Sequence, residues 1–132
     1  MKLVKILLIL SLIFAGCLQA EKGIYKDISV DEAYELIQKN KNNPNFVILD
    51  IRTPEEFESG HIEGAINIDY YSPNFKEELK KLDKNKVYLI YCRTGHRTSL
   101  AMPIFKELGF KEVYNMLGGI TEWKNRGYPV VD

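Results

Sequence analysis

The chain has 132 residues, of which 45% are hydrophobic and 27% charged, a composition that indicates one globular domain and excludes a wholly disordered protein. Its 18 basic residues balance its 18 acidic ones, so it lacks the basic excess of a nucleic-acid-binding protein and we expect no nucleic-acid partner. Two cysteines and two histidines are too few for a disulfide framework, a four-cysteine zinc site or a histidine-rich metal site, so we expect no metal ion and no other cofactor.

An export leader is predicted over residues 1–20. Lys2 and Lys5 are followed by an apolar run over residues 6–18, an order that is typical of a signal peptide. This run of 13 residues is shorter than the ~20 that a membrane-spanning helix needs, which favours a processed signal over a retained membrane helix. We therefore expect an exported domain in the periplasm or the cell envelope.

Two cleavage sites fit this leader. Residues 14–17, Phe-Ala-Gly-Cys, resemble a bacterial lipobox, in which cleavage before the cysteine leaves that residue lipid-modified. Cleavage after Ala20 is the alternative, although Leu18 then stands where the A-x-A pattern has a small residue. We favour lipidation of Cys17, which would tether the domain to a membrane through a lipid anchor only, without spanning it.

Strands and helices are predicted to alternate along the rest of the chain. Short apolar runs at 46–49 and 87–91, with weaker ones at 65–68 and 112–116, are typical of strands buried in a parallel sheet. Helices are expected from capping signals at Ser29 and Thr53 and from apolar stripes at 73–82, between Cys92 and Gly109, and at 120–125. The alternation predicts an α/β domain with a mainly parallel sheet and helices on both faces.

The segment after the run at 87–91 contains the residues that point to chemistry. Cys92 directly follows a buried strand, and a short loop with Gly95 separates it from the next helix. Ligands of open α/β sheets bind at the carboxyl ends of the strands, where loop N–H groups and a helix N-terminus attract an anion. The same field favours a thiolate, so we expect Cys92 to be a nucleophile rather than an inert packing residue. Arg97 would add a fixed positive charge to the bound group.

Four motifs resemble single-domain rhodanese sulfurtransferases. The segment Cys92-Arg93-Thr94-Gly95-His96-Arg97-Thr98 is similar to the family's C-R-x-G-x-R-[ST] active-site loop. Three further segments of the family are matched by Leu-Asp-Ile-Arg at 49–52 with Glu-Glu-Phe at 55–57, by Gly-His-Ile-Glu-Gly-Ala-Ile-Asn-Ile at 60–68, and by Leu-Gly-Gly-Ile at 117–120 with Trp123 and Gly-Tyr-Pro-Val at 127–130. The resemblance is specific because the four motifs follow one another in the family's order over residues 26–132.

The resemblance implies a rhodanese-like domain over residues 26–132 with a central five-stranded sheet. It implies that Cys92 carries a sulfane sulfur as a persulfide, taken from thiosulfate or a related donor and passed to cyanide, a small thiol or a protein acceptor. It also assigns donor binding to the loop, where the backbone N–H groups of Arg93, Thr94, Gly95, His96, Arg97 and Thr98 would cradle the persulfide. Arg97 would close the loop, and Arg93 would help to hold the anionic donor.

Asp50 and Arg52 flank the end of an expected strand. We interpret them as a structural pair that supports the active-site loop, because persulfide formation requires no obligate general base. A cysteine phosphatase is the enzymatic alternative, but such enzymes place five residues between the cysteine and the arginine, whereas four separate Cys92 from Arg97. A carrier that delivers sulfur to one dedicated protein is the other alternative, and its sequence would look the same.

Overall fold

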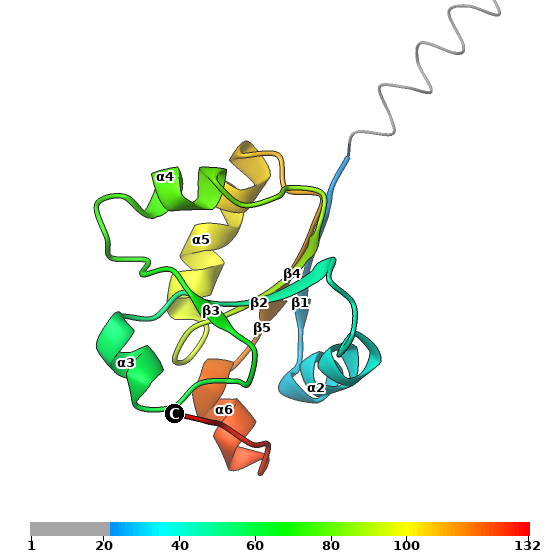
Figure 1. Cartoon of the computed structure of the whole chain (residues 1–132), viewed down its shortest axis with the longest axis vertical. Helices are drawn as coiled ribbons and strands as arrows, with labels where there is room; N and C mark the ends of the chain where they lie inside the picture. The colour runs from blue at the N-terminus through cyan, green and yellow to red at the C-terminus, as the bar shows by residue number, and fades with distance from the viewer. Residues whose placement is uncertain (1–21) are drawn as a thin grey trace, which may run out of the picture.

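Five strands form the centre of the structure, a computed structural model that describes residues 22–132; the predicted leader and Cys17 lie outside the described residues. The strands are β1 (Ile24–Ile28), β2 (Phe46–Asp50), β3 (Ile66–Asn67), β4 (Val87–Tyr91) and β5 (Glu112–Met116). Their order across the sheet is β1-β5-β4-β2-β3, and all neighbouring strands are parallel (Figure 1). β4 therefore occupies the middle of the sheet.

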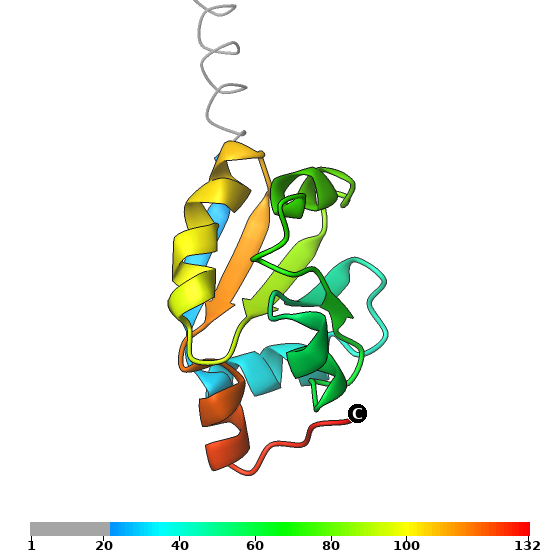
Figure 2. The same cartoon turned by 90° about the vertical axis from the view of Figure 1, so that its left-hand side faces the viewer.

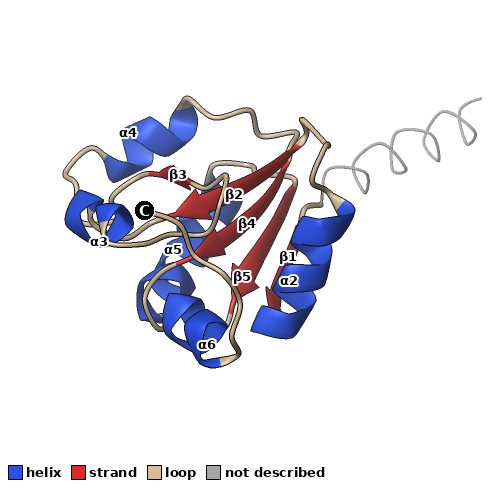
Figure 3. Cartoon of the chain, turned by 60° about the horizontal axis from the view of Figure 1, so that its bottom comes forward, coloured by secondary structure: helices blue, strands red, loops and turns tan. Residues whose placement is uncertain are grey.

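Helices cover both faces of this sheet. They are α2 (Val30–Lys39), α3 (Pro54–Glu58), α4 (Phe75–Lys80), α5 (His96–Glu107) and α6 (Gly119–Asn125). One core layer contains buried residues of α4 and α5, and the other contains those of α2 and α6, so these pairs lie on opposite faces (Figure 3). The predicted capping boxes are present at Ser29 and Thr53, where each side chain accepts a hydrogen bond from the third helical N–H group.

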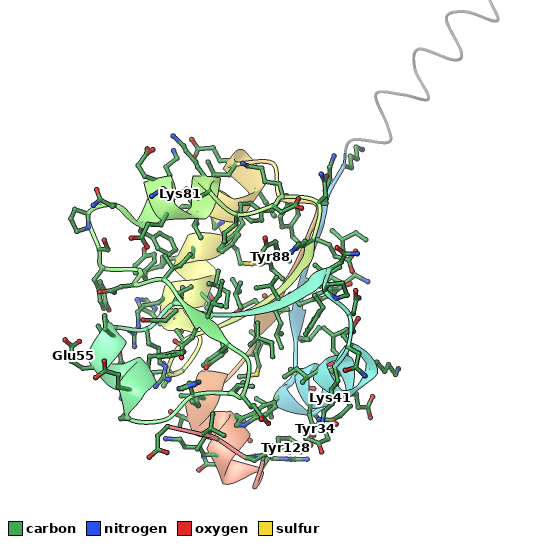
Figure 4. The ribbon with its side chains drawn as sticks, viewed as in Figure 1. Tyr34, Lys41, Glu55, Lys81, Tyr88 and Tyr128 are labelled. Atoms are coloured by element: carbon green, nitrogen blue, oxygen red, sulfur yellow. The ribbon has the colours of Figure 1, made fainter. Side chains whose placement is uncertain are left out.

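The two core layers explain why the central strands are apolar throughout. In β4, Tyr88 and Ile90 pack into the layer of α4 and α5, whereas Leu89 and Tyr91 pack into the layer of α2 and α6. Successive strand residues point to opposite faces, and here both faces are buried. Figure 4 shows Tyr88 inside the molecule, with the stacked rings of Tyr34 and Tyr128, 4.4 Å apart, beside α2 and α6.

The predicted α/β class and the sheet flanked on both faces are confirmed, and the mainly parallel sheet is entirely parallel among the described residues. The strands at 87–91 and 112–116 have the predicted bounds, and the run at 46–49 extends to Asp50. The weak candidate at 65–68 contributes only two strand residues, and the helix at 73–82 is shorter than predicted. β1 was not predicted from its residue pattern. Within residues 22–132, no helix has both the length and the apolar character required to cross a membrane.

Candidate active site

Cys92 lies at the carboxyl end of the central strand. β4 ends at Tyr91, and Cys92, the next residue, is only 1% exposed. The chain then turns into α5, and Figure 2 shows this loop at the lower end of the sheet, directly above α6. The sulfur is thus buried at the carboxyl ends of the strands, as the sequence predicts.

Gly95 shapes the turn around the sulfur. It is the N-cap residue of α5 and has a φ of +101°, in the left-handed region that favours glycine. Its N–H group donates a hydrogen bond to Cys92 Sγ at 3.1 Å, and the Thr98 hydroxyl oxygen lies 3.7 Å from the same sulfur. The positive end of the α5 dipole also lies against this loop. The sulfur therefore faces an N–H donor, a hydroxyl and the N-terminus of a helix.

Arg97 is held by Glu56 of α3. Its Nη1 and Nη2 groups donate to the two carboxylate oxygens at 2.7 and 2.9 Å. The hydrogen bond from Arg97 is the main cause that lowers the pKa of Glu56 to about 2, and the same bond raises the pKa of Arg97. The sequence predicts that Arg97 closes the loop and adds a fixed positive charge to the bound group. In the structure the guanidinium joins the loop to α3 and shares its charge with a carboxylate.

Three other loop residues are exposed at the surface beside the sulfur: Arg93, Thr94 and His96. Tyr71, which follows β3, is 65% exposed, and its ring centroid lies 5.3 Å from Arg97 Cζ. Arg93 is therefore better placed than Arg97 to meet an anionic donor arriving from solvent, because its charge is accessible and the charge of Arg97 is paired.

The first turn of α6 supports the loop from below, a role that the sequence reasoning missed. The N–H groups of Ile120 and Thr121 donate to the carbonyl oxygens of Cys92 and Arg93, both at 3.0 Å. Gly119 permits this contact, because a Cβ atom at this position would lie 2.5 Å from each of those two oxygens. The signal in the sequence was the Gly118-Gly119 pair, which we had noted only as part of a family motif.

Asp50 and Arg52 form a buried ion pair with an Nη2–Oδ2 distance of 2.7 Å and side-chain exposures of 0% and 4%. Arg52 Nη2 also donates to the Gly60 carbonyl oxygen at 2.6 Å, and its Cζ atom lies 5.7 Å from the centroid of the Tyr91 ring. The recorded hydrogen bonds of this pair reach the loop before β3 rather than residues 92–98. Its link to the active-site loop is therefore indirect, through Tyr91.

Two other observations concern the parts of the structure away from the loop around Cys92. No group of three or more metal-ligating side chains occurs in the described part of the chain. A hollow of about 650 Å³ is lined by α2, β2, the segment before β3 and the C-terminal tail, but no residue of the Cys92 loop contributes to it. The hollow is lined by no cysteine and by none of the predicted site residues, so the loop around Cys92 is the candidate site.

The chain is similar to several known proteins over most of its length. The family model described as "Rhodanese-like domain" matches residues 29–126. A "Thiosulfate sulfurtransferase GlpE" from Coxiella burnetii is 37% identical over 101 residues, covering 76% of this chain and 89% of that protein. "Rhodanese-like domain-containing protein 17" from Arabidopsis thaliana is 33% identical over 115 residues, covering 78% and 70%.

Solved structures share the fold. A rhodanese-related protein from Thermoplasma volcanium has a TM-score of 0.69 and 33% identity, covering 81% of this chain and 98% of that one. A protein from Rhodopseudomonas palustris, described as a "Possible Tyrosine Phosphatase", has a TM-score of 0.66 and 26% identity, covering 81% and 85%. The description of that second protein names a phosphatase, the alternative activity considered from the sequence, and the two activities differ in the loop that they require.

Proposed function

Because the chain belongs to the family of rhodanese-like domains, we propose that it is a sulfurtransferase that carries a sulfane sulfur as a persulfide on Cys92. The observation that carries this proposal is the hydrogen bond from the Gly95 N–H group to Cys92 Sγ at 3.1 Å. It lies at the N-terminus of α5, where a thiolate and a persulfide anion are both stabilised. The similarity to thiosulfate sulfurtransferases supports the same chemistry.

The first half-reaction loads the cysteine. The Cys92 thiolate attacks the sulfane sulfur of thiosulfate, a new S–S bond forms, and sulfite leaves with the electron pair of the bond that breaks. The exposed guanidinium of Arg93 would hold the sulfonate oxygens while the sulfane sulfur reaches Sγ. No external oxidant or reductant is needed, because one S–S bond replaces another.

The second half-reaction unloads it. An acceptor such as cyanide, a small thiol or a protein thiol, in its anionic form, attacks the outer sulfur of the persulfide. The S–S bond then breaks, and the Cys92 thiolate takes back the electron pair. With cyanide the product is thiocyanate, and with a thiolate it is a persulfide of the acceptor. The exposed side chains of Thr94 and His96 are the ones that this acceptor would meet first.

The test is intact mass spectrometry of the protein after exposure to thiosulfate. Wild type is expected to gain one sulfur atom, about 32 Da, and to lose it again on addition of cyanide. Cys92→Ser is expected to gain nothing. A wild type that stays unmodified, or a serine variant that takes up sulfur, would overturn the proposal.

The phosphatase alternative is less well supported by the loop. Four residues between Cys92 and Arg97 form a smaller cradle than the five of cysteine phosphatases, and the guanidinium that would bind a phosphate is already paired with Glu56. We therefore expect no turnover of an aryl phosphate under conditions in which thiosulfate loads Cys92.

We also propose that the protein is exported and anchored to the cell envelope by a lipid on Cys17, on the basis of the charged, apolar and Phe-Ala-Gly-Cys segments of its sequence. The full chain expressed in a bacterium is expected in the membrane fraction, and Cys17→Ala is expected to remain unprocessed or to be released. A mature protein that is found in the soluble fraction and begins at Glu21 would contradict the anchor.

A further inference from the structure

One hydroxyl proton beside the sulfur has two acceptors within reach. Thr98 Oγ1 donates to the Gly95 carbonyl oxygen at 3.1 Å in the geometry of the structure, and it also lies 3.7 Å from Cys92 Sγ, where either atom could be the donor. A threonine hydroxyl has a single proton, so it can donate to only one of them at a time. Thr98 is 0% exposed and Cys92 is 1% exposed, so bulk water does not compete for this proton. Which acceptor receives it therefore decides whether the sulfur has one hydrogen-bond donor or two.

Ser99 competes with Thr98 for the Gly95 carbonyl. Ser99 Oγ donates to that oxygen at 2.7 Å, which is 0.4 Å shorter than the Thr98 contact of 3.1 Å. The N–H group of Ser99 donates to the same oxygen at 3.1 Å. A carbonyl oxygen has two lone pairs, and Ser99 alone supplies a donor for each of them.

Asn115 of β5 makes a weak contact with the Ser99 hydroxyl oxygen. Its Nδ2 group donates to Ser99 Oγ, at a long distance of 3.5 Å, and to Asp27 Oδ1 at 3.1 Å. Because the Ser99 oxygen accepts from Asn115, its own proton points to the Gly95 carbonyl, the acceptor recorded for it. The arrangement spans three elements and ends at the turn that holds the sulfur.

We propose that Ser99 is a positioning residue, which occupies the Gly95 carbonyl and thereby leaves the Thr98 proton to the Cys92 sulfur. Ser99 does not touch the sulfur itself, and it is the first residue beyond the seven-residue loop motif. The inference rests on the proposed sulfur transfer, in which the Cys92 thiolate is the attacking group and gains from each donor directed at it. Without the Ser99 hydroxyl, the Thr98 proton turns to the carbonyl and the sulfur loses a donor.

A double-mutant cycle tests this coupling. Thr98→Val removes the hydroxyl while keeping the shape of the side chain, and Ser99→Ala removes its competitor. Each single variant is expected to slow two reactions of Cys92 roughly tenfold: alkylation by iodoacetamide at neutral pH, and sulfur loading from saturating thiosulfate. A hydrogen bond to a charged group is worth about this factor.

The double variant is also expected to be roughly tenfold slower than wild type, since both changes remove the same donor. Thr98→Ser and Ser99→Thr restore the hydroxyls and should recover most of each rate.

Ser59→Ala is the matched control. Ser59 Oγ also donates to a main-chain oxygen, that of Glu56, at 2.7 Å, but it is the C-cap residue of α3 and no hydrogen bond joins its side chain to the loop. We expect Ser59→Ala to react at the wild-type rates. A slower reaction of Ser99→Ala alone would then not be a general effect of removing a hydrogen bond from a serine hydroxyl to the main chain. All rates are measured at a temperature at which every variant is folded, so lower global stability alone would leave them unchanged.

The outcomes separate this inference from the function it rests on. If wild type takes up no sulfur while the alkylation rates still show the non-additive pattern, the proposed function fails and the coupling between Ser99 and Thr98 stands. If wild type takes up sulfur but Ser99→Ala reacts as fast as wild type, the inference is wrong. A double variant that is about a hundredfold slower would also overturn it, because the two hydroxyls would then act independently.

Discussion

Glu56 and Arg97 lie 41 positions apart in the chain and form an ion pair with two hydrogen bonds of 2.7 and 2.9 Å, one to each carboxylate oxygen. Glu56 also completes the capping box of α3 with Thr53, so one carboxylate caps the N-terminus of the helix and holds the active-site loop. The side chains of Arg97 and Glu56 are 10% and 27% exposed, which makes the pair stronger than a fully solvated one.

Glu56→Gln tests the contribution of this charge. The amide oxygen still accepts the capping hydrogen bonds, whereas the ionic attraction to Arg97 is lost. Folding lowers the pKa of Glu56 from 4.5 to about 2, which corresponds to at most about 3 kcal/mol in the free energy of unfolding. Because the pair is partly exposed to solvent, we expect a contribution of about 1–2 kcal/mol. We expect a loss of that size at neutral pH in urea unfolding.

The pH dependence gives this prediction a sign. A carboxyl whose pKa is lowered by folding stabilises the native state above its unfolded pKa, and this stabilisation is lost as the pH falls from about 4.5 to about 2. The difference in stability between wild type and Glu56→Gln should therefore shrink across that window. Glu55→Gln is the control, since Glu55 is exposed and points away from the loop (Figure 4). Equal pH profiles for wild type and Glu56→Gln would contradict the assigned role.

Gly119→Ala tests the support that α6 gives to the loop. Gly119 has a φ of +59°, and an added Cβ atom would lie 2.5 Å from the carbonyl oxygens of Cys92 and Arg93. We expect a loss of more than about 2 kcal/mol in thermal unfolding, together with slower sulfur loading, because the backbone must move to relieve the overlap.

Gly127→Ala separates the two causes of this loss. Gly127 also has a positive φ, of +81°, but no heavy atom lies within 4 Å of the Cβ position. It should lose only the left-handed backbone preference, about 1–2 kcal/mol, and load sulfur at the wild-type rate. If the two alanine variants lose the same stability and load sulfur equally fast, the close contact between Gly119 and the loop does not contribute to sulfur transfer.

The central part of the fold was predictable because its signals are local. The apolar run of β4 and the capping signals at Ser29 and Thr53 depend on neighbouring residues, and each lies where the sequence placed it. β1 has no such signal, because Lys26 and Asp27 interrupt its apolar residues at the edge of the sheet. It is a strand because it pairs with β5. The paired residues Asp27 and Asn115, for example, are 88 positions apart in the chain.

The candidate site divides in the same way. Cys92, its place at a strand end and the glycine-containing turn follow from the order of residues alone. The partners of the loop do not, since Glu56 and Gly119 reach it through tertiary contacts that no spacing rule encodes. For Arg97, the sequence shows the positive charge but not the carboxylate of Glu56 that pairs with it.

Arg52→Ala tests whether Asp50 and Arg52 are structural. Removing the guanidinium leaves the Asp50 carboxylate buried with 0% exposure and without its ionic partner, and leaves the Gly60 carbonyl without a donor. Breaking a buried pair in this way costs about 3–5 kcal/mol, which urea unfolding would measure. Arg52→Lys should fall between this variant and wild type, because an ammonium group keeps the charge but cannot reproduce the planar fork, whose Nε and Nη2 groups meet Asp50 Oδ1 and Oδ2. Since the recorded contacts of the pair do not reach residues 92–98, the folded fraction of Arg52→Ala should load sulfur from thiosulfate at close to the wild-type rate. A variant of wild-type stability that no longer loads sulfur would instead place Arg52 in the chemistry of the site.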